Sequence, residues 1–236
     1  MDGNGRWARK QMLPRSAGHV AGMAAVRRIV DVAREAKLEY LTLYAFSTEN
    51  WSRPKTEVTF LMGLLRQYFD SDLNRLKKDN VRMRVIGVRR GLDQAVVGLV
   101  EEAEAITRDN TGLNLTFAFN YGSREEIVAA ARTLAHAAAG GTLNPDAIDA
   151  AMFSSALQTA HAPDPDLVIR TSGERRLSNF LLWQSAYAEF VFVDTLWPDF
   201  SAEDLHKALA EYAGRERRFG GVEPAIEIPA RLADVD

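Results

Sequence analysis

The chain has 236 residues, a net charge of −3 and no cysteine, with 47% hydrophobic and 26% charged residues. This composition is typical of a globular protein with a sizeable core, and the missing cysteines exclude disulfides, thiolate metal ligands and a cysteine nucleophile. We find no apolar run long enough for a signal peptide or a membrane-spanning helix, and the negative charge disfavours a general nucleic-acid binder, so we expect a cytoplasmic protein.

The first eight residues, MDGNGRWA, combine a carboxylate, two glycines and an arginine. Glycine lets a backbone approach a ligand closely, and the N–H groups of such a loop can bind an anion. Arg6 adds a bidentate donor for phosphate, and Asp2 can hold the cation that accompanies a polyphosphate. A plain turn is the alternative, because Asp-Gly and Asn-Gly are common turn dipeptides.

Helical and strand-like segments alternate along the rest of the chain. Apolar spacing predicts helices at residues 17–37, 57–78, 92–108, 123–139, 145–158 and 202–216. Apolar, β-rich segments predict strands at residues 38–47, 81–88, 113–121, 167–171 and 189–194. Strands that alternate with helices favour one α/β domain over residues 1–236, with a central, largely parallel sheet flanked by helices.

Polar clusters follow three of these strands, at residues 47–54 (STENWSRP), 120–125 (NYGSRE) and 170–179 (RTSGERRLSN). In open α/β sheets, ligands bind outside the carboxyl ends of the strands. We therefore expect the three clusters and the opening loop to converge on a phosphate or diphosphate site.

The helix predicted from Glu57 is apolar around most of its first half, where a helix with one buried face would show a stripe. It either packs on both sides in an ordinary core or lines a slot for a hydrocarbon ligand. His19, close after Arg15, likewise either donates to a phosphate or has a capping or surface role. We find no Ser-His-Asp arrangement, no zinc-spaced histidine pair and no DDxxD helix.

Six stretches, in order over nearly the whole chain, resemble the cis-prenyltransferases, and most closely the bacterial enzymes that make undecaprenyl diphosphate. They are MDGNGRWA, GHVAGMAAVRRIV, LTLYAFSTENWSRP, LNLTFAFNYGSREEI, DLVIRTSGERRLSNFLLWQSAYAEFVFVDTLWPDF and RERRFGG.

The resemblance implies a Mg²⁺-dependent reaction in which isopentenyl diphosphate is added repeatedly to an allylic diphosphate, usually farnesyl diphosphate. Each addition leaves a cis double bond, and the implied product is long, the C55 lipid-carrier precursor. The resemblance also implies a homodimer with a hydrophobic product tunnel walled by the helix after Pro54, and a peripheral membrane contact for product release. A short- or medium-chain synthase, a non-catalytic subunit and a nucleic-acid module are the competing interpretations.

Site residues follow from the same resemblance. Asp2 matches a catalytic aspartate that engages Mg²⁺, Asn50 matches a residue proposed to accept a proton, and Glu189 matches a second magnesium-linked carboxylate reached from the partner subunit. Because a neutral amide is a weak base, we interpret Asn50 as a positioning or relay group. Substrate-binding matches are Gly3, Asn4, Gly5, Arg6, Trp7, Arg15, His19, Ser47, Thr48, Glu49, Trp51 and Arg53 on the allylic side, with Arg170, Arg176, Leu177 and Ser178 for isopentenyl diphosphate.

The chain departs from the family pattern at two places. In the family an apolar strand runs into the MDGN motif, whereas here Met1 comes first. We expect this to expose a strand edge and to loosen Asp2. Ser172 stands in RTSGE where glycine is usual, which we expect to restrict the loop that carries Arg176. The basic run of residues 215–219 is interpreted as a tail near the dimer interface, with a nucleic-acid patch as the alternative.

Overall fold

The computed structural model describes residues 1–215, and the predicted alternation of helices and parallel strands is confirmed in it. The end of the last predicted helix at residue 216 and residues 216–219 of the basic run lie outside the described residues. Strand β3 (Asn114–Tyr121) is central, with β1 (Tyr40–Ser47) parallel on one side and β2 (Arg82–Ile86) parallel on the other. Strands β4 (Leu167–Arg170) and β5 (Glu189–Phe192) form a second parallel pair.

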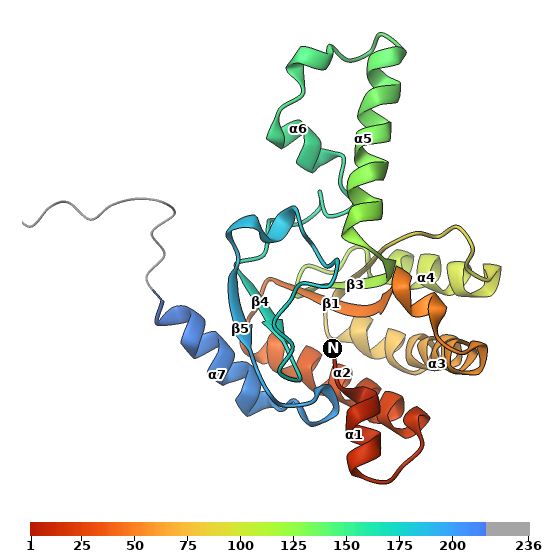
Figure 1. Cartoon of the computed structure of the whole chain (residues 1–236), viewed down its shortest axis with the longest axis vertical. Helices are drawn as coiled ribbons and strands as arrows, with labels where there is room; N and C mark the ends of the chain where they lie inside the picture. The colour runs from red at the N-terminus through yellow and green to blue at the C-terminus, as the bar shows by residue number, and fades with distance from the viewer. Residues whose placement is uncertain (216–236) are drawn as a thin grey trace, which may run out of the picture.

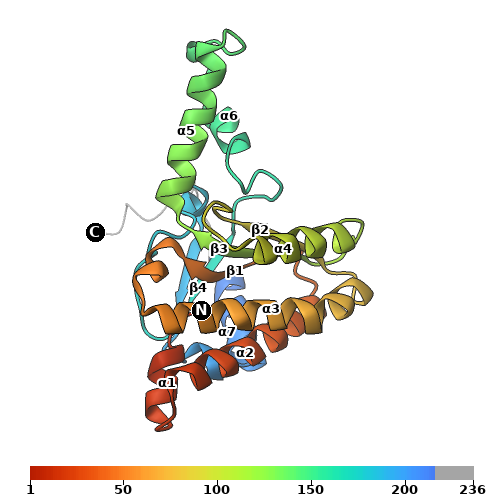
Figure 2. The same ribbon diagram turned by 90° about the vertical axis from the view of Figure 1, so that its right-hand side faces the viewer.

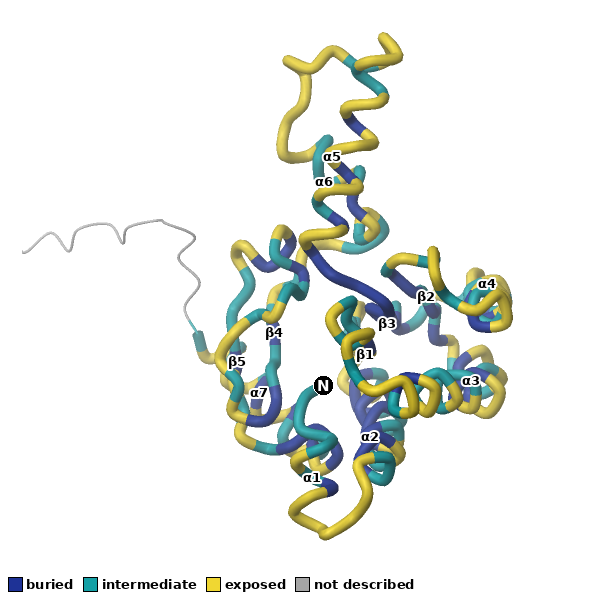
Figure 3. Tube along the Cα trace, turned by 45° about the vertical axis from the view of Figure 1, so that its right-hand side comes forward, coloured by how far each residue is buried: buried dark blue, intermediate teal, exposed yellow. Residues whose placement is uncertain are grey.

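The strands therefore form two hydrogen-bonded sheets where one continuous sheet was expected. Within residues 1–215, β1 pairs only with β3, and β4 pairs only with β5. The free edges of β1 and β4 both border one large cavity. Figure 3 shows the two groups of strands on either side of the N-terminal residues.

Long helices cover the strands (Figures 1 and 2). Helix α2 (Arg15–Glu35) packs against α3 (Lys55–Lys78) and α7 (Ala202–Ala213), while α4 (Gln94–Thr107) packs on β2 and α3. The core between these layers is apolar because every second strand residue points into it. Buried members include Val26, Val30, Leu43, Phe46, Phe69, Leu76, Met83, Leu115 and Phe117.

Helix α5 (Ser123–Ala139) extends out of the body, and the much shorter α6 (Ala150–Ser155) returns beside it (Figures 1 and 2). The helix predicted at residues 145–158 is wrong in length. Two side chains start separate short helices there: Asn144 caps a 3-10 turn at Pro145–Ala147, and Asp149 accepts from the Met152 N–H to start α6.

The opening octapeptide is also not a loop. After Gly3, which has φ 106°, residues Asn4–Lys10 form helix α1. This helix packs on α2 through Gly18 and Gly22, where a Cβ would lie 2.0 Å from the Asn4 carbonyl oxygen and 2.6 Å from the Asn4 side-chain oxygen, respectively. The two glycines thus set how closely α1 approaches α2.

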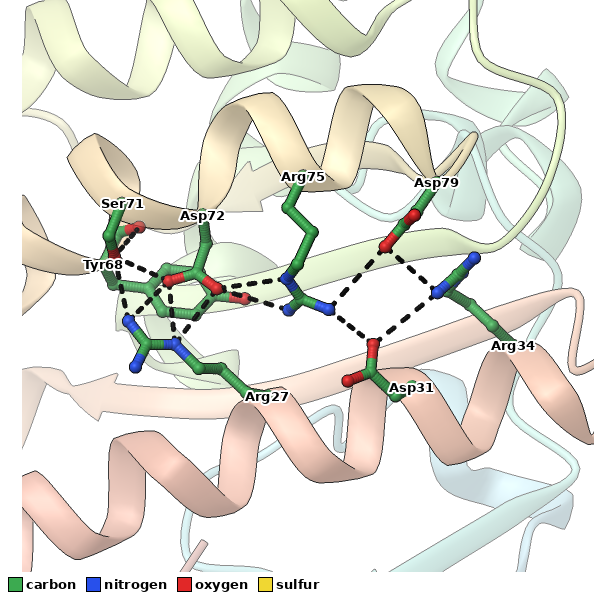
Figure 4. A network of polar contacts seen from close by, with 8 residues as sticks. All are labelled: Arg27, Asp31, Arg34, Tyr68, Ser71, Asp72, Arg75 and Asp79. Atoms are coloured by element: carbon green, nitrogen blue, oxygen red, sulfur yellow. Dashed lines mark hydrogen bonds and ion pairs between the residues drawn. The ribbon is translucent and has the colours of Figure 1, made fainter.

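An ion seam fastens α2 to α3 (Figure 4), and we define it as Arg27, Asp31, Arg34, Ser71, Asp72, Arg75 and Asp79. Asp72 is buried and accepts from Arg27 Nε at 2.8 and 3.0 Å. Burial raises the pKa of Asp72, but hydrogen bonds from Arg27 and Ser71 outweigh it, so the pKa is lowered overall. The two helices are therefore joined by charges that alternate along their contact.

Candidate active site

The site begins at Asp2, which three residues hold in place. Its N–H donates to Thr171 Oγ1 at 2.9 Å, and its carbonyl accepts from the Trp197 N–H at 2.9 Å. The Asp2 carboxylate accepts from Arg170 Nε at 3.0 Å. Asp2 is thus fixed at the carboxyl end of β4, contrary to the expectation that it would be loose.

Arg170 connects Asp2 to the loop after β4. Its Nη1 donates to Ser178 Oγ at 2.9 Å, so one guanidinium contacts both the carboxylate and the hydroxyl. Arg176 in the same loop is mostly exposed and pairs with Glu174. Arg170, Arg176, Leu177 and Ser178 all border the cavity, as the expected binding of a common ligand requires.

Arg6 reaches the same loop from α1. Its Nη1 donates to the Ser172 carbonyl at 3.0 Å, its Nη2 donates to Ser172 Oγ, and it forms an ion pair with Glu174 at 3.0 Å. Ser172 has φ 71°, a left-handed conformation that favours glycine. The serine therefore restricts the backbone there, but its hydroxyl also gives Arg6 a second acceptor.

A second group of predicted residues converges on Glu57, at the start of α3. Glu57 Oε1 lies 3.2 Å from His19 Nε2, 3.2 Å from Arg53 Nη1 and 3.6 Å from Arg15 Nε. Burial lowers the pKa of His19, although the hydrogen bond and charge of Glu57 oppose the shift. Sequence reasoning did not assign Glu57; the i, i+4 spacing from Arg53 is the signal that could have found it.

The loop after β1 begins with a short 3-10 helix at Thr48–Ser52. Asn50 caps it by accepting from the Ser47 N–H at 3.2 Å, and Trp51 Nε1 donates to Asn120 Oδ1 at 2.7 Å. Thr48 Oγ1 contacts Glu49 at 3.3 Å. Burial raises the pKa of Glu49, but hydrogen bonds from its own backbone and from Asn179, Ser47 and Thr48 lower it overall.

Asn179 joins the three polar loops. Its Nδ2 donates to Glu49 at 3.0 Å and to Glu125 at 3.2 Å, and its Oδ1 accepts from the Arg124 N–H at 2.8 Å. The expected convergence of the loops after β1, β3 and β4 is therefore confirmed. Asn179 had no predicted role because its partners lie 54 and 130 residues away.

Glu189 lies apart from this group. It begins β5, pairs with Arg215 at 2.7 Å, and is in register with Leu167 at the start of β4, whereas Asp2 lies at that strand's far end. Within one chain, Glu189 and Asp2 are therefore not brought together. No group of three or more histidine or acidic side chains in residues 1–215 is arranged to hold a metal ion.

The cavity beside these residues has a volume of about 1170 Å³. The predicted site residues that line its wall, together with Asn179, are polar except for Leu177. They are Asp2, Asn4, His19, Ser47, Glu49, Asn50, Arg53, Arg170, Arg176, Leu177, Ser178 and Asn179. Other parts are apolar, including Met23, Val26 and Ile29 of α2, Leu61, Leu64, Leu65 and Tyr68 of α3, and Phe117 and Phe119 of β3. The buried Asn4 side-chain oxygen has no hydrogen-bond partner within residues 1–215 and faces Gly22 of α2.

Of the other predicted residues, Gly3 and Gly5 are in close packing. A Cβ on Gly3 would lie 2.8 Å from Leu196 Cδ2, and one on Gly5 would lie 3.0 Å from Arg15 Nε. Trp7 Nε1 donates to Asp199 at 2.7 Å. Gly3, Gly5, Arg6, Trp7, Arg15, Thr48 and Trp51 thus support or flank the cavity wall and do not line it.

Comparisons with known proteins show the family to which this chain belongs. A family model described as "Putative undecaprenyl diphosphate synthase" matches residues 1–220. The isoprenyl transferase of Brucella abortus biovar 1 is 57% identical over 230 residues, which cover 98% of this chain and 91% of that protein. The isoprenyl transferase of Caulobacter vibrioides is 51% identical, covering 94% of this chain and 86% of that protein.

Two solved structures share the fold. Lavandulyl diphosphate synthase from Lavandula x intermedia, in complex with dimethylallyl diphosphate, has a TM-score of 0.90 and 38% identity, covering 93% of this chain and 95% of that one. A probable undecaprenyl diphosphate synthase from Campylobacter jejuni has a TM-score of 0.76 and 34% identity, covering 85% of this chain and 92% of that one.

Proposed function

Because this chain belongs to the undecaprenyl diphosphate synthase family of isoprenyl transferases, the cis-prenyltransferases, we propose that it adds isopentenyl diphosphate repeatedly to farnesyl diphosphate. The proposed product is undecaprenyl diphosphate, a precursor of the lipid carrier for the cell wall. One observation carries the proposal: a cluster of arginine donors and one carboxylate lies beside a cavity of about 1170 Å³ with apolar walls. The apolar part of the wall, from α2, α3 and β3, suits the hydrocarbon chain of such a substrate.

The reaction requires three things of the protein. The allylic C–O bond breaks, so the departing diphosphate needs positive charge and hydrogen-bond donors. The double bond of isopentenyl diphosphate forms the new C–C bond, so its carbon must be held in line with the allylic carbon. A proton then leaves the isopentenyl unit, which restores a double bond and completes the balance.

For the allylic diphosphate we propose the side of the cavity formed by α1 and α2. Arg6 flanks this side and would supply charge-assisted donors on turning from Glu174, and Asn4 borders the cavity there. Gly3 and Gly5 keep the backbone close to this side, with Trp7 adjacent. His19, Arg15 and Arg53 form a second layer around Glu57, so we propose that they orient the site through that carboxylate.

For isopentenyl diphosphate we propose Arg170, Arg176 and Ser178, with Leu177 beside them. Arg170 already contacts Ser178 Oγ at 2.9 Å, and Arg176 is exposed enough to turn from Glu174 toward a ligand. Two guanidinium groups and a hydroxyl match the oxygens of a diphosphate better than those of a single phosphate. The loop containing Ser47, Thr48, Glu49 and Trp51 borders both positions and is proposed to hold the reacting ends together.

The residues present fit a Mg²⁺ ion carried by a diphosphate. Magnesium in proteins is commonly bound by one or two carboxylates together with substrate phosphates, so an all-protein cage is not needed. The Asp2 carboxylate lies at the cavity with Oδ2 bound to Arg170. We propose that Asp2 holds the ion, which when bound supplies positive charge to the leaving diphosphate, and that Glu189 of a second subunit assists.

Asn50 is proposed to position the proton that leaves. Its side-chain oxygen caps the Ser47 N–H at 3.2 Å, which fixes the amide at the cavity wall. A neutral amide is too weak a base to keep a proton, so the proton passes on to the diphosphate or to water. Asn50 therefore contributes orientation.

We propose that the protein acts as a homodimer and visits the membrane surface to release its product. The hairpin of α5 and α6 projects from the body and exposes Val128 and Ile148, which suits it to a second copy (Figure 2). No helix within residues 1–215 is long and apolar enough to span a bilayer. Light scattering of the purified protein measures the oligomeric state directly.

Mass spectrometry of products tests the reaction. Purified protein is mixed with farnesyl and isopentenyl diphosphates, with Mg²⁺ or with EDTA. Metal-dependent polyprenyl diphosphates would support the proposal, and their length would show whether the product is C55. A product of a single condensation would favour a short-chain synthase, and no product from a folded dimer would contradict the proposed function.

A further inference from the structure

We propose that the turn between α1 and α2 docks the protein on an anionic lipid surface. We define the α1 tip as Arg9, Lys10, Met12 and Leu13, at the end of α1 farthest from the active site. Met12 is 94% exposed and Leu13 is 46% exposed. The turn lies at the opposite end of the molecule from the α5 hairpin and is coloured as exposed in Figure 3.

The backbone holds these apolar side chains outward. The Leu13 N–H donates to the Ala8 carbonyl at 2.8 Å, and the Met12 N–H donates to the Arg9 carbonyl at 3.1 Å, which together form a Schellman helix end. Met12 occupies the left-handed position of this motif, with φ 56°, where glycine is usual. The turn thus holds the apolar side chain of Met12 in solvent. The left-handed backbone conformation of Met12 is less favourable for methionine than for glycine.

The sequence around the tip is basic. Residues 3–30 contain six lysines and arginines and no acidic residue, in a chain with 29 basic and 32 acidic residues. Within residues 1–215 neither Arg9 nor Lys10 forms an ion pair, and Arg15 nearby has a 61% exposed side chain whose one ion pair, to Glu57, is 3.6 Å long. Arg9 and Lys10 are therefore available to an external anion.

An apolar tip flanked by unpaired cations matches a membrane with acidic headgroups. Methionine and leucine can enter the region below the headgroups, while lysine and arginine remain at their level. Each such cation is attracted to an anionic surface, so these two give weak, reversible docking. A phosphate backbone would engage the cations but would leave Met12 and Leu13 in water.

The position of the tip gives docking a consequence for the proposed function. Helix α1 has seven residues, so its far end lies roughly 10 Å from the residues that open the active site, at a rise of 1.5 Å per residue. Docking would hold the site close to the lipid into which its product must pass. The inference thus rests on the proposed release at a membrane, but its test requires no turnover.

The test is co-sedimentation of the full-length protein with lipid vesicles. Vesicles of phosphatidylcholine alone are compared with vesicles that also contain phosphatidylglycerol, at low and high salt. We expect binding to the anionic vesicles that weakens with salt. The double variants Met12→Ser/Leu13→Ser and Arg9→Gln/Lys10→Gln should each reduce the partition coefficient on the order of tenfold.

Matched controls lie elsewhere on the surface. Val88→Ser removes an exposed apolar side chain in the loop after β2, and Lys77→Gln/Lys78→Gln removes two exposed cations from the end of α3. Neither should change vesicle binding. The inference is overturned if anionic vesicles do not bind the protein, if the controls weaken binding as much as the tip variants do, or if the tip variants abolish self-association, which would assign the tip to a contact between two copies. Because binding is measured without substrate, a failure of the proposed reaction would leave this result unaffected.

Discussion

Arg170 places Nε and Nη2 within 3.0 and 2.9 Å of the same carboxylate oxygen of Asp2, a residue 168 positions away in the chain. The contact joins the first residues of the chain to the end of β4. The second carboxylate oxygen of Asp2 forms no hydrogen bond or ion pair within residues 1–215. A carboxylate that is fixed by an arginine and still open at one oxygen is suited to a metal-bound diphosphate.

Asp2→Ala should reduce kcat by at least about a hundredfold, because a charge that acts on the leaving group is lost. The fold should persist, since a half-exposed ion pair contributes about 1 kcal/mol or less. Steady-state kinetics and thermal unfolding of the same preparation measure both effects. Activity close to that of the unchanged protein would remove Asp2 from the mechanism.

Arg176→Ala should raise KM for isopentenyl diphosphate about tenfold or more, with a smaller effect on farnesyl diphosphate. The stability should not change, because Arg176 is 64% exposed and its one ion pair is with Glu174. Arg175→Ala is the matched control: it removes the neighbouring exposed arginine and should leave both KM values alone. An equal loss for both substrates would refute the division into two diphosphate positions.

Gly18→Ala should destabilise the protein by about 2 kcal/mol and impair the site, because the new Cβ would lie 2.0 Å from the Asn4 carbonyl oxygen and push α1 off α2. Gly98→Ala, in the exposed part of α4 with open space around it, should instead stabilise by about 0.5–1 kcal/mol. Denaturant unfolding of the two variants gives the comparison. Equal effects would mean that the close approach of α1 is not required.

Two substitutions of Tyr68 should have different effects on stability. Its side chain is buried at the cavity wall, in edge contact with Phe117 at 5.7 Å, and its hydroxyl has no partner within residues 1–215. Tyr68→Phe should therefore leave the free energy of unfolding unchanged or raise it, since an unsatisfied polar group is removed. Tyr68→Ala should cost about 3–4 kcal/mol and, under the proposed function, shift products to longer chains. Unchanged product lengths would show that Tyr68 does not limit the hydrocarbon.

The stability should fall as the pH is lowered through about 6.5, the ordinary pKa of histidine. Burial lowers the pKa of both His19 and His161 in the folded protein, so the unfolded chain takes up protons first as the pH falls. The contribution of each is complete above the unfolded pKa and is lost below it. His19→Gln should flatten this slope in pH-dependent denaturant titrations. An unchanged slope would argue that Glu57 compensates fully for a protonated His19.

The sequence predicted most of the architecture because its strongest signals are local. The apolar runs of β1 and β3 and the helix at Ser123–Ala139 need no distant partner to be seen. Helix α1 was missed because Gly3-Asn4-Gly5 is typical of a turn, and only packing against Gly18 and Gly22 makes it helical. The strand predicted to residue 88 ends at Ile86 because Gly87, with φ 129°, leaves the extended conformation.

The site residues likewise include some that the sequence predicts and some that it does not. Residues in the opening motif and the polar loops could be selected from the sequence, since charge and glycine mark them. Glu57 and Asn179 could not, because each acquires its meaning from partners that the fold brings together from different elements. The division of the strands into two sheets could not be predicted either, because pairing between distant strands leaves no local pattern.

The ion seam lies between helices whose other faces line the cavity. Arg27, Asp72 and Arg75 join α2 to α3, while Met23, Val26, Leu61 and Leu65 of the same helices face the hydrocarbon space. The residues that join α2 to α3 are thus different from the residues of these helices that shape the cavity. Substitutions at positions such as 61 and 65 could therefore change the size of the cavity without breaking the ion pairs between α2 and α3. Product length and protein stability could then evolve independently of each other.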